Sequence, residues 1–180
     1  MSIRQKNSAK KRFFLASFSL LLCLSGLLAG CDNGDENNSD GGTAVVLSSE
    51  ASSDLNSHLT RAINDEYRAK NTYIAVMNKF GEVQPFANIK NSEEQQISML
   101  VNLFNNYGLP VPANTASGLS VPGTLSEACS LGVQAEIENA NMYDELLAGT
   151  IDYPDVQTVF KKLQSASSDQ HLPAFQECAD

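Results

Sequence analysis

The chain has 180 residues, of which 42% are hydrophobic and 18% are charged, and this length accommodates one globular domain with accessory segments. Five of its 12 basic residues precede residue 13, where no acid occurs, so the rest of the chain has 7 basic against 21 acidic residues. This acidic excess argues against a nucleic-acid partner, which needs a basic face, and the presence of only two histidines excludes a multi-histidine zinc centre.

Residues 1–30 have the pattern of a secretory signal peptide, with a basic start followed by an apolar run over residues 13–28. Serine and glycine residues interrupt this run, so the alternative, a permanent membrane span, would be a weak one. Residues 28–31, Leu-Ala-Gly-Cys, resemble the bacterial lipobox, whose cysteine is acylated and becomes the new N-terminus. The resemblance implies that Cys31 carries lipid such as palmitate and anchors the protein to a membrane of the bacterial cell envelope.

Residues 31–54 comprise this cysteine and a polar stretch rich in Gly, Ser, Asn and Asp. Such a composition cannot bury enough apolar surface to order itself, so we expect a disordered tether. The domain that follows would face the periplasm or the exterior. Asp32 implies retention at the inner membrane if the enteric sorting rule applies.

The chain has four cysteines. Cys23 leaves with the signal peptide and Cys31 is lipidated, which leaves Cys129 and Cys178 together in an oxidising compartment. We therefore expect these two to form a disulfide.

From residue 55 onward, apolar residues recur at spacings of three and four, which is typical of amphipathic helices. Glycine and proline residues divide this region into four stretches of helical length, at 55–80, 85–107, 126–149 and 154–178. Because the longest connection is the middle one, the pattern predicts an all-α, antiparallel four-helix bundle over residues 55–180. We expect Ser126 to cap the third helix and Pro173 to kink the fourth just past His171.

Polar side chains interrupt the apolar stripe of each helix near its middle. Glu66, Glu93, Glu136 and His171 come to nearly the same level when residues are counted from the connections at about 1.5 Å each. Any one of them alone would be interpreted as a boundary or satisfied core residue. Three carboxylates at one level repel one another and need protons or a cation, so we expect a bound divalent cation.

Short motifs follow one another in the same region: Asp65-Glu66-Tyr67-Arg68-Ala69, Pro85-Phe86-Ala87-Asn88-Ile89 with Ser92-Glu93, Ala135-Glu136 with Met142-Tyr143-Asp144, and His171-Leu172 with Ala174-Phe175. In order and spacing they resemble the ferritin-like superfamily and, within it, the "domain of unknown function 2202" family. The resemblance implies a bundle that binds two metals through a Glu on helices one and three and a Glu-x-x-His on helices two and four. It implies no particular reaction.

The sequence departs from this ligand set at two positions. Gln96 occupies the histidine slot of the second helix, and Ser168 occupies the glutamate slot of the fourth. The resemblance therefore implies one surviving metal position, formed by Glu93, Glu136 and His171.

The other position keeps only Glu66, Glu93 and Gln96, so we expect one ion rather than two. Asn139, one turn beyond Glu136, would supplement the surviving position or hydrogen-bond its ligands. Two carboxylates, one imidazole and open positions for water suit iron or manganese better than a closed zinc site.

Two functions remain open for the domain. The first is an envelope-anchored metal-binding protein with a degenerate dinuclear site, engaged in redox chemistry or metal handling. The second is a non-catalytic, lipid-anchored scaffold or partner-binding module whose metal site has decayed. The sequence does not decide whether the protein is an enzyme, and either function is compatible with a homo-oligomer.

The lipoprotein interpretation predicts that Cys31→Ala blocks lipidation and processing, because the acylated sulfur is removed. Membrane fractionation and intact mass before and after the substitution measure this. An unchanged mass in the membrane fraction would contradict the interpretation.

Overall fold

The computed structural model describes residues 48–117 and 120–180, so the predicted signal peptide, Cys31 and most of the predicted tether lie outside the described residues. The described part is helical, with α1 (Ser49–Phe80), α2 (Phe86–Asn106), α3 (Leu125–Gly149), α4 (Pro154–Ala166), the single π-turn η1 (Ser167–His171) and α5 (Leu172–Ala179). No helix among these residues is long and apolar enough to cross a membrane.

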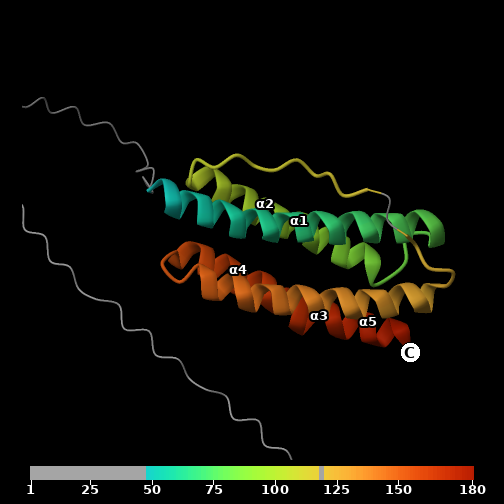
Figure 1. The fold of residues 1–180 in the computed structure, drawn as a ribbon. Coiled ribbons are helices and arrows are strands. Elements are labelled where there is room, and N and C mark those ends of the chain that lie inside the picture. Colours follow the sequence, from blue (N-terminus) through green and yellow to red (C-terminus); the bar gives the residue numbers. More distant parts are fainter. Residues whose placement is uncertain (1–47, 118–119) are drawn as a thin grey trace, which may run out of the picture. The chain divides into compact units, whose positions relative to one another are not determined.

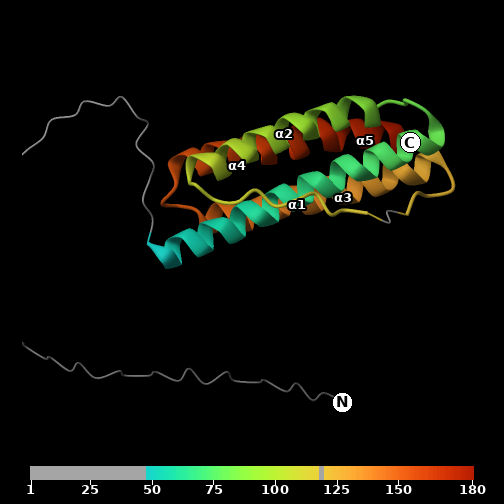
Figure 2. The same ribbon diagram turned by 90° about the horizontal axis from the view of Figure 1, so that it is seen from above.

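The helices form an antiparallel four-helix bundle, which confirms the predicted all-α fold. α1 and α2 make one helical hairpin, and α3 makes a second with α4, η1 and α5, which together act as one long helix (Figure 1). The two hairpins lie against each other along their lengths, as Figures 1 and 2 show. α1 packs on α3 and α2 on α4, so facing helices run in opposite directions.

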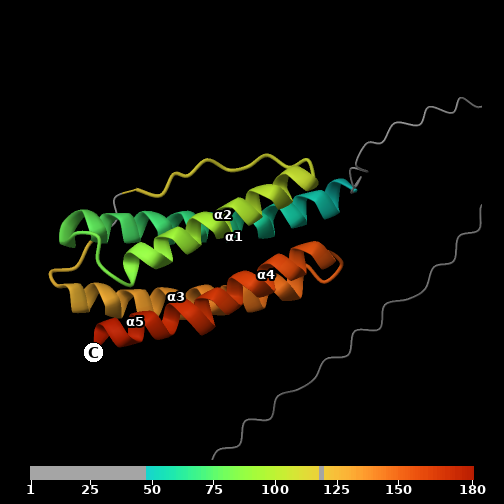
Figure 3. The same cartoon turned by 180° about the vertical axis from the view of Figure 1, so that it is seen from behind.

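The connection between α2 and α3 runs the full length of the bundle (Figure 3). It lies along α1, where Tyr67 donates to the carbonyl of Pro112 and Asn71 donates to that of Ala116. Because this crossover returns the chain to the starting end of α2, α3 runs parallel to α2 and antiparallel to α1.

α1 begins six residues before the predicted helix start at Leu55, so residues 49–54 are helical rather than part of a tether. Ser48 is the N-cap, and its hydroxyl accepts a hydrogen bond from the backbone N–H of Ala51. Glu50 adds an acid to the first turn, where the helix dipole favours negative charge. The polar composition of residues 49–54 therefore led to the prediction of a tether where the structure has the first turns of a capped helix.

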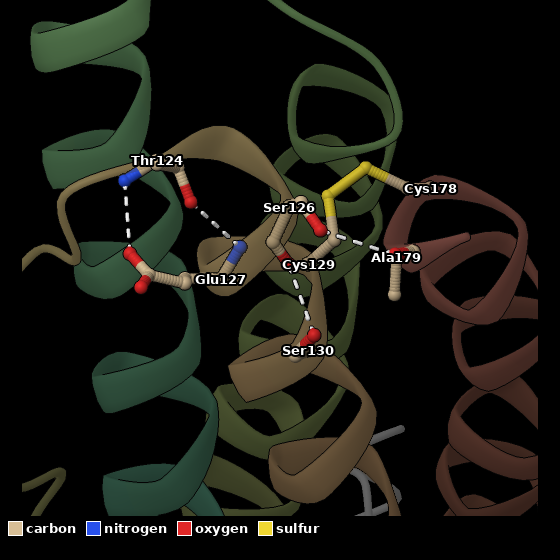
Figure 4. The surroundings of a disulfide bond; sticks show 7 residues. All are labelled: Thr124, Ser126, Glu127, Cys129, Ser130, Cys178 and Ala179. Atoms are coloured by element: carbon tan, nitrogen blue, oxygen red, sulfur yellow. Dashed lines mark hydrogen bonds between the residues drawn. A yellow bond between two sulfur atoms is a disulfide. The ribbon is translucent and has the colours of Figure 1, made fainter.

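α3 is capped by Thr124, two residues before the predicted cap at Ser126. The Thr124 hydroxyl accepts from the N–H of Glu127, while the Glu127 carboxylate accepts from the N–H of Thr124 (Figure 4). This reciprocal capping box satisfies two free donors at the helix start, which a serine at the second helical position cannot do. Ser126 instead donates to the carbonyl of Ala179 and ties α3 to the end of α5.

The fourth helix departs from regular α-helical geometry at residues 167–171, before Pro173. The sequence had predicted a kink just past His171 instead. In η1 the N–H of Leu172 bonds to the carbonyl of Ser167, five residues earlier, and Pro173 then opens α5. A proline cannot donate to the carbonyl four residues before it, so the wide turn accommodates that missing bond without ending the helix. Within this stretch Ser167 is buried, whereas Ser168 is half-buried.

Two apolar clusters fill the core, one on each side of a polar layer. One cluster joins the first half of α1 to the second halves of α2 and α3 and to α4, through residues such as Leu59, Phe104 and Phe160. The other joins the opposite ends of the same helices and includes Tyr73 and Phe175. The residues predicted to bind metal lie between the clusters.

The second cluster is closed by the disulfide between Cys129 on α3 and Cys178 on α5, whose Cα atoms are 5.7 Å apart (Figure 4). The structure thus confirms the predicted pairing. Gly132 lets α5 approach closely, because a Cβ atom there would lie 2.6 Å from the Phe175 ring. The bond and this contact both fix the element that follows His171.

The bond closes a loop with a sequence separation of 49, so replacing both cysteines by serine should lower the free energy of unfolding by about 4 kcal/mol in the chain-entropy description. Urea unfolding of Cys129→Ser/Cys178→Ser measures this, with the reduced wild type as the matched control. Reactive thiols at both Cys129 and Cys178 in the unreduced mature wild type would contradict the pairing.

Candidate metal centre

Three side chains from three elements meet in the polar layer: Glu93 of α2, Glu136 of α3 and His171 of η1. They are 2%, 3% and 3% exposed, and one ligand atom from each lies within 4.8 Å of the others. Nδ1 of His171 is 3.3 Å from Oε1 of Glu93 and 3.3 Å from Oε2 of Glu136. The structure therefore brings together the three residues of the predicted surviving position.

The spacing of these atoms fits a shared ion. Two ligands that are each about 2.1 Å from one metal lie about 3.0 to 3.4 Å apart at octahedral or tetrahedral angles. Both distances from Nδ1 of His171 to the carboxylate oxygens, 3.3 Å each, fall in this range. In addition, Oε2 of Glu93 is buried without a hydrogen-bond donor among the described residues. A carboxylate oxygen in this condition needs a proton or a cation.

Glu66 is 1% exposed and lies beside this group without being one of its three members. Its Oε1 accepts a hydrogen bond of 2.5 Å from the hydroxyl of Tyr143, and its carboxyl group is near enough to that of Glu93 for each to shift the other's pKa. Gln96 is also buried, and its Nε2 donates to Oγ of Ser92 at 3.3 Å. The second predicted position thus consists of a tyrosine-bound carboxylate and an amide directed at a serine.

Asn139, predicted to supplement the surviving position, uses both ends of its amide elsewhere. Its Nδ2 donates to Oδ2 of Asp65 at 2.7 Å, and its Oδ1 accepts from the hydroxyl of Ser167 at 2.6 Å. It therefore connects α1 to the π-turn that carries His171. Ser168, which occupies the predicted glutamate slot, donates to Oδ1 of Asp169, whereas Ser167 is buried and donates to Oδ1 of Asn139.

Sequence reasoning missed Tyr73, whose hydroxyl donates to Oε1 of Glu136 at 2.5 Å. In the sequence it occupies an ordinary position on an apolar stripe, and nothing there marks its hydroxyl. Tyr143 stands in the sequence motif Met142-Tyr143-Asp144 without a predicted role, and its hydroxyl donates to Oε1 of Glu66. The two tyrosines have equivalent roles, because each donates to one buried carboxylate from across the bundle.

Burial dominates the electrostatics of the layer. It raises the pKa of Glu93 well above its ordinary value, and the neighbouring charge of Glu66 raises that pKa further. Burial also raises the pKa of Glu66, although hydrogen bonds with Glu93 and Tyr143 oppose the shift. The pKa values of Tyr73 and Tyr143 are raised by burial and by the facing carboxylates, so both remain hydrogen-bond donors.

A pocket of about 240 Å³ between α1 and α3 reaches the site from outside. Glu93 and Glu136 line its inner part together with Tyr73. Asp65 and Arg68, which form an ion pair on α1, line it as well. The layer is therefore buried but not sealed.

No family model matches the chain, and no curated protein matches it at a significant level. The fold is similar to the crystal structure of a hypothetical protein from Methanococcus jannaschii DSM 2661, with a TM-score of 0.61 and 21% sequence identity. The match covers 75% of this chain and 82% of that one. At this identity the similarity supports the helical fold alone.

The raised carboxyl pKa values predict how stability depends on pH. Above the ordinary value of 4.5 the unfolded chain releases protons that Glu93 and Glu66 retain when folded, so metal-free protein should lose stability as pH rises toward the raised values. Glu93→Gln should flatten this slope, whereas Glu94→Gln, an exposed neighbour on α2, should leave it unchanged.

Urea unfolding between about pH 5 and pH 8, in the presence of a chelator, measures the slope. If Glu93→Gln and Glu94→Gln gave the same slope as the wild type, the assignment of the retained protons to this pair would be wrong.

Proposed function

We propose that this protein binds one divalent metal ion through Glu93, Glu136 and His171. The observation that carries the proposal is the convergence of these three buried ligand atoms at spacings that fit a shared ion. The buried carboxyls also supply the negative charge that a dication neutralises more completely than a single proton does.

The donor set favours manganese or ferrous iron. It offers carboxylate oxygens and one imidazole, and it contains no thiolate, because Cys129 and Cys178 are paired elsewhere. Three protein ligands leave positions for water, which these ions accept readily. The pocket between α1 and α3 provides a route by which a small molecule could reach the ion, as redox chemistry or metal handling requires.

The wider assignment is a degenerate member of the ferritin-like proteins that is anchored to the bacterial cell envelope. It is supported by the bundle with its lengthwise crossover, by the position of the ligands on the second, third and fourth helices, and by the lipobox-like residues 28–31. The loss of the second ion is consistent with Gln96, which contacts Ser92 instead of offering an imidazole.

One observation favours the alternative, a scaffold without metal. Tyr73 and Tyr143 each satisfy one oxygen of a buried carboxylate, so protonation of the remaining carboxyls would complete the layer without an ion. Elemental analysis of protein purified without chelator distinguishes the two functions. Stoichiometric manganese or iron supports metal binding, and its absence after supplementation supports the scaffold.

Metal binding predicts that His171→Ala weakens affinity by more than about 100-fold, since loss of a direct ligand should exceed the 10- to 100-fold cost of an outer partner. Gln96→Ala should cost less, because Gln96 is not one of the three ligands. His58→Ala removes the other histidine of the chain, which contacts a backbone carbonyl on α1, and serves as the matched control.

Isothermal titration of each variant with Mn²⁺ and Fe²⁺ gives affinity and stoichiometry. Two equal sites per chain, or no binding by the wild type with either ion, would contradict the one-ion proposal.

A further inference from the structure

The imidazole of His171 has close polar contacts at both of its nitrogens, with the carboxylates of Glu93 and Glu136 at Nδ1 and with Ser92 at Nε2. Nδ1 lies 3.3 Å from Oε1 of Glu93, and Nε2 lies 3.0 Å from Oγ of Ser92. The ring therefore lies between the proposed ligand Glu93 and the hydroxyl of Ser92, the residue directly before it in α2. A metal that binds Nδ1 needs the lone pair of that nitrogen, so the ring proton must be on Nε2, facing Ser92.

Ser92 is itself fixed by Gln96, its neighbour one turn along α2, whose Nε2 is 3.3 Å from Oγ of Ser92. The other amide atom, Oε1, is buried without a donor among the described residues. Turning the amide over would let Oε1 accept the Ser92 hydroxyl proton and would complete a directed chain, Nε2–H to Oγ–H to Oε1. That chain starts at the imidazole and leaves Nδ1 unprotonated.

We propose that Ser92 and Gln96 are positioning residues that hold His171 with its Nδ1 lone pair presented to the metal ion. This inference rests on the metal-binding function proposed above. The resemblance implies a histidine ligand at position 96. In this proposal Gln96 instead orients Ser92, which is the hydrogen-bond partner of His171.

The test compares Mn²⁺ affinity among the wild type, Ser92→Ala, Ser92→Thr and Ser98→Ala. Ser92→Ala should bind about 10- to 100-fold more weakly, as is usual when the partner of a histidine ligand is removed. Ser92→Thr keeps the hydroxyl and should restore affinity, while Ser98→Ala, on the exposed face of α2, should bind like the wild type. Gln96→Ala should shift affinity in the same direction as Ser92→Ala but less, and it replaces that variant if Ser92→Ala does not fold.

A second measurement reports on the ring directly. With Zn²⁺ as a diamagnetic probe, ¹⁵N NMR of labelled histidine should show a slowly exchanging proton on Nε2 of His171 in the wild type and Ser92→Thr, and a fast one in Ser92→Ala. Unchanged affinity and unchanged exchange in Ser92→Ala would overturn the positioning role while leaving metal binding intact. Absence of Mn²⁺ binding by the wild type would overturn the proposed function itself.

Discussion

The mutual repulsion of the buried carboxylates of Glu66, Glu93 and Glu136 is the constraint around which this bundle is built. Each of the three is at most 3% exposed, and such a group is costly to bury unless something neutralises it or bonds to it. The surrounding residues supply partners for these groups. Tyr73 donates to Glu136 and Tyr143 donates to Glu66, and Nδ1 of His171 lies 3.3 Å from both Glu93 and Glu136. The two apolar clusters on either side of the layer limit the access of water that could otherwise hydrogen-bond to these carboxylates.

Much of this arrangement could be predicted because helical periodicity is a strong signal over long segments. The apolar stripes predicted four helices, and counting along them placed Glu93, Glu136 and His171 at one level, where the structure has them. The disulfide agrees with the same antiparallel register, since Cys129 lies seven residues before Glu136 and Cys178 lies seven residues after His171. Because the rise per residue of an α-helix is constant, the number of residues from a connection gives the position along the bundle axis. Residues of facing helices at the same position come close together.

The parts that could not be predicted depend on local departures from regular geometry and on hydrogen bonds between distant residues. The π-turn η1 is one such departure, because helical periodicity alone does not predict a widened turn ahead of Pro173. The hydroxyl of Tyr73 donates to Glu136, which is 63 residues further along the chain. The apolar periodicity of α1 predicts that the ring of Tyr73 faces the core, but it gives no partner for the hydroxyl. The start of α1 was missed because its capping serine lies in a stretch whose overall composition is polar.

The division of the bundle into two helical hairpins has a consequence for the order of events during folding. Contacts within each hairpin are local, so both hairpins can form early, whereas Glu93 belongs to the first hairpin and Glu136 and His171 to the second. The group of Glu93, Glu136 and His171 therefore comes together only when the hairpins dock, and an ion bound to all three would cross-link the hairpins. Loss of that ion would weaken the seam between the hairpins before either hairpin unravels, and opening would begin as a separation of two intact halves.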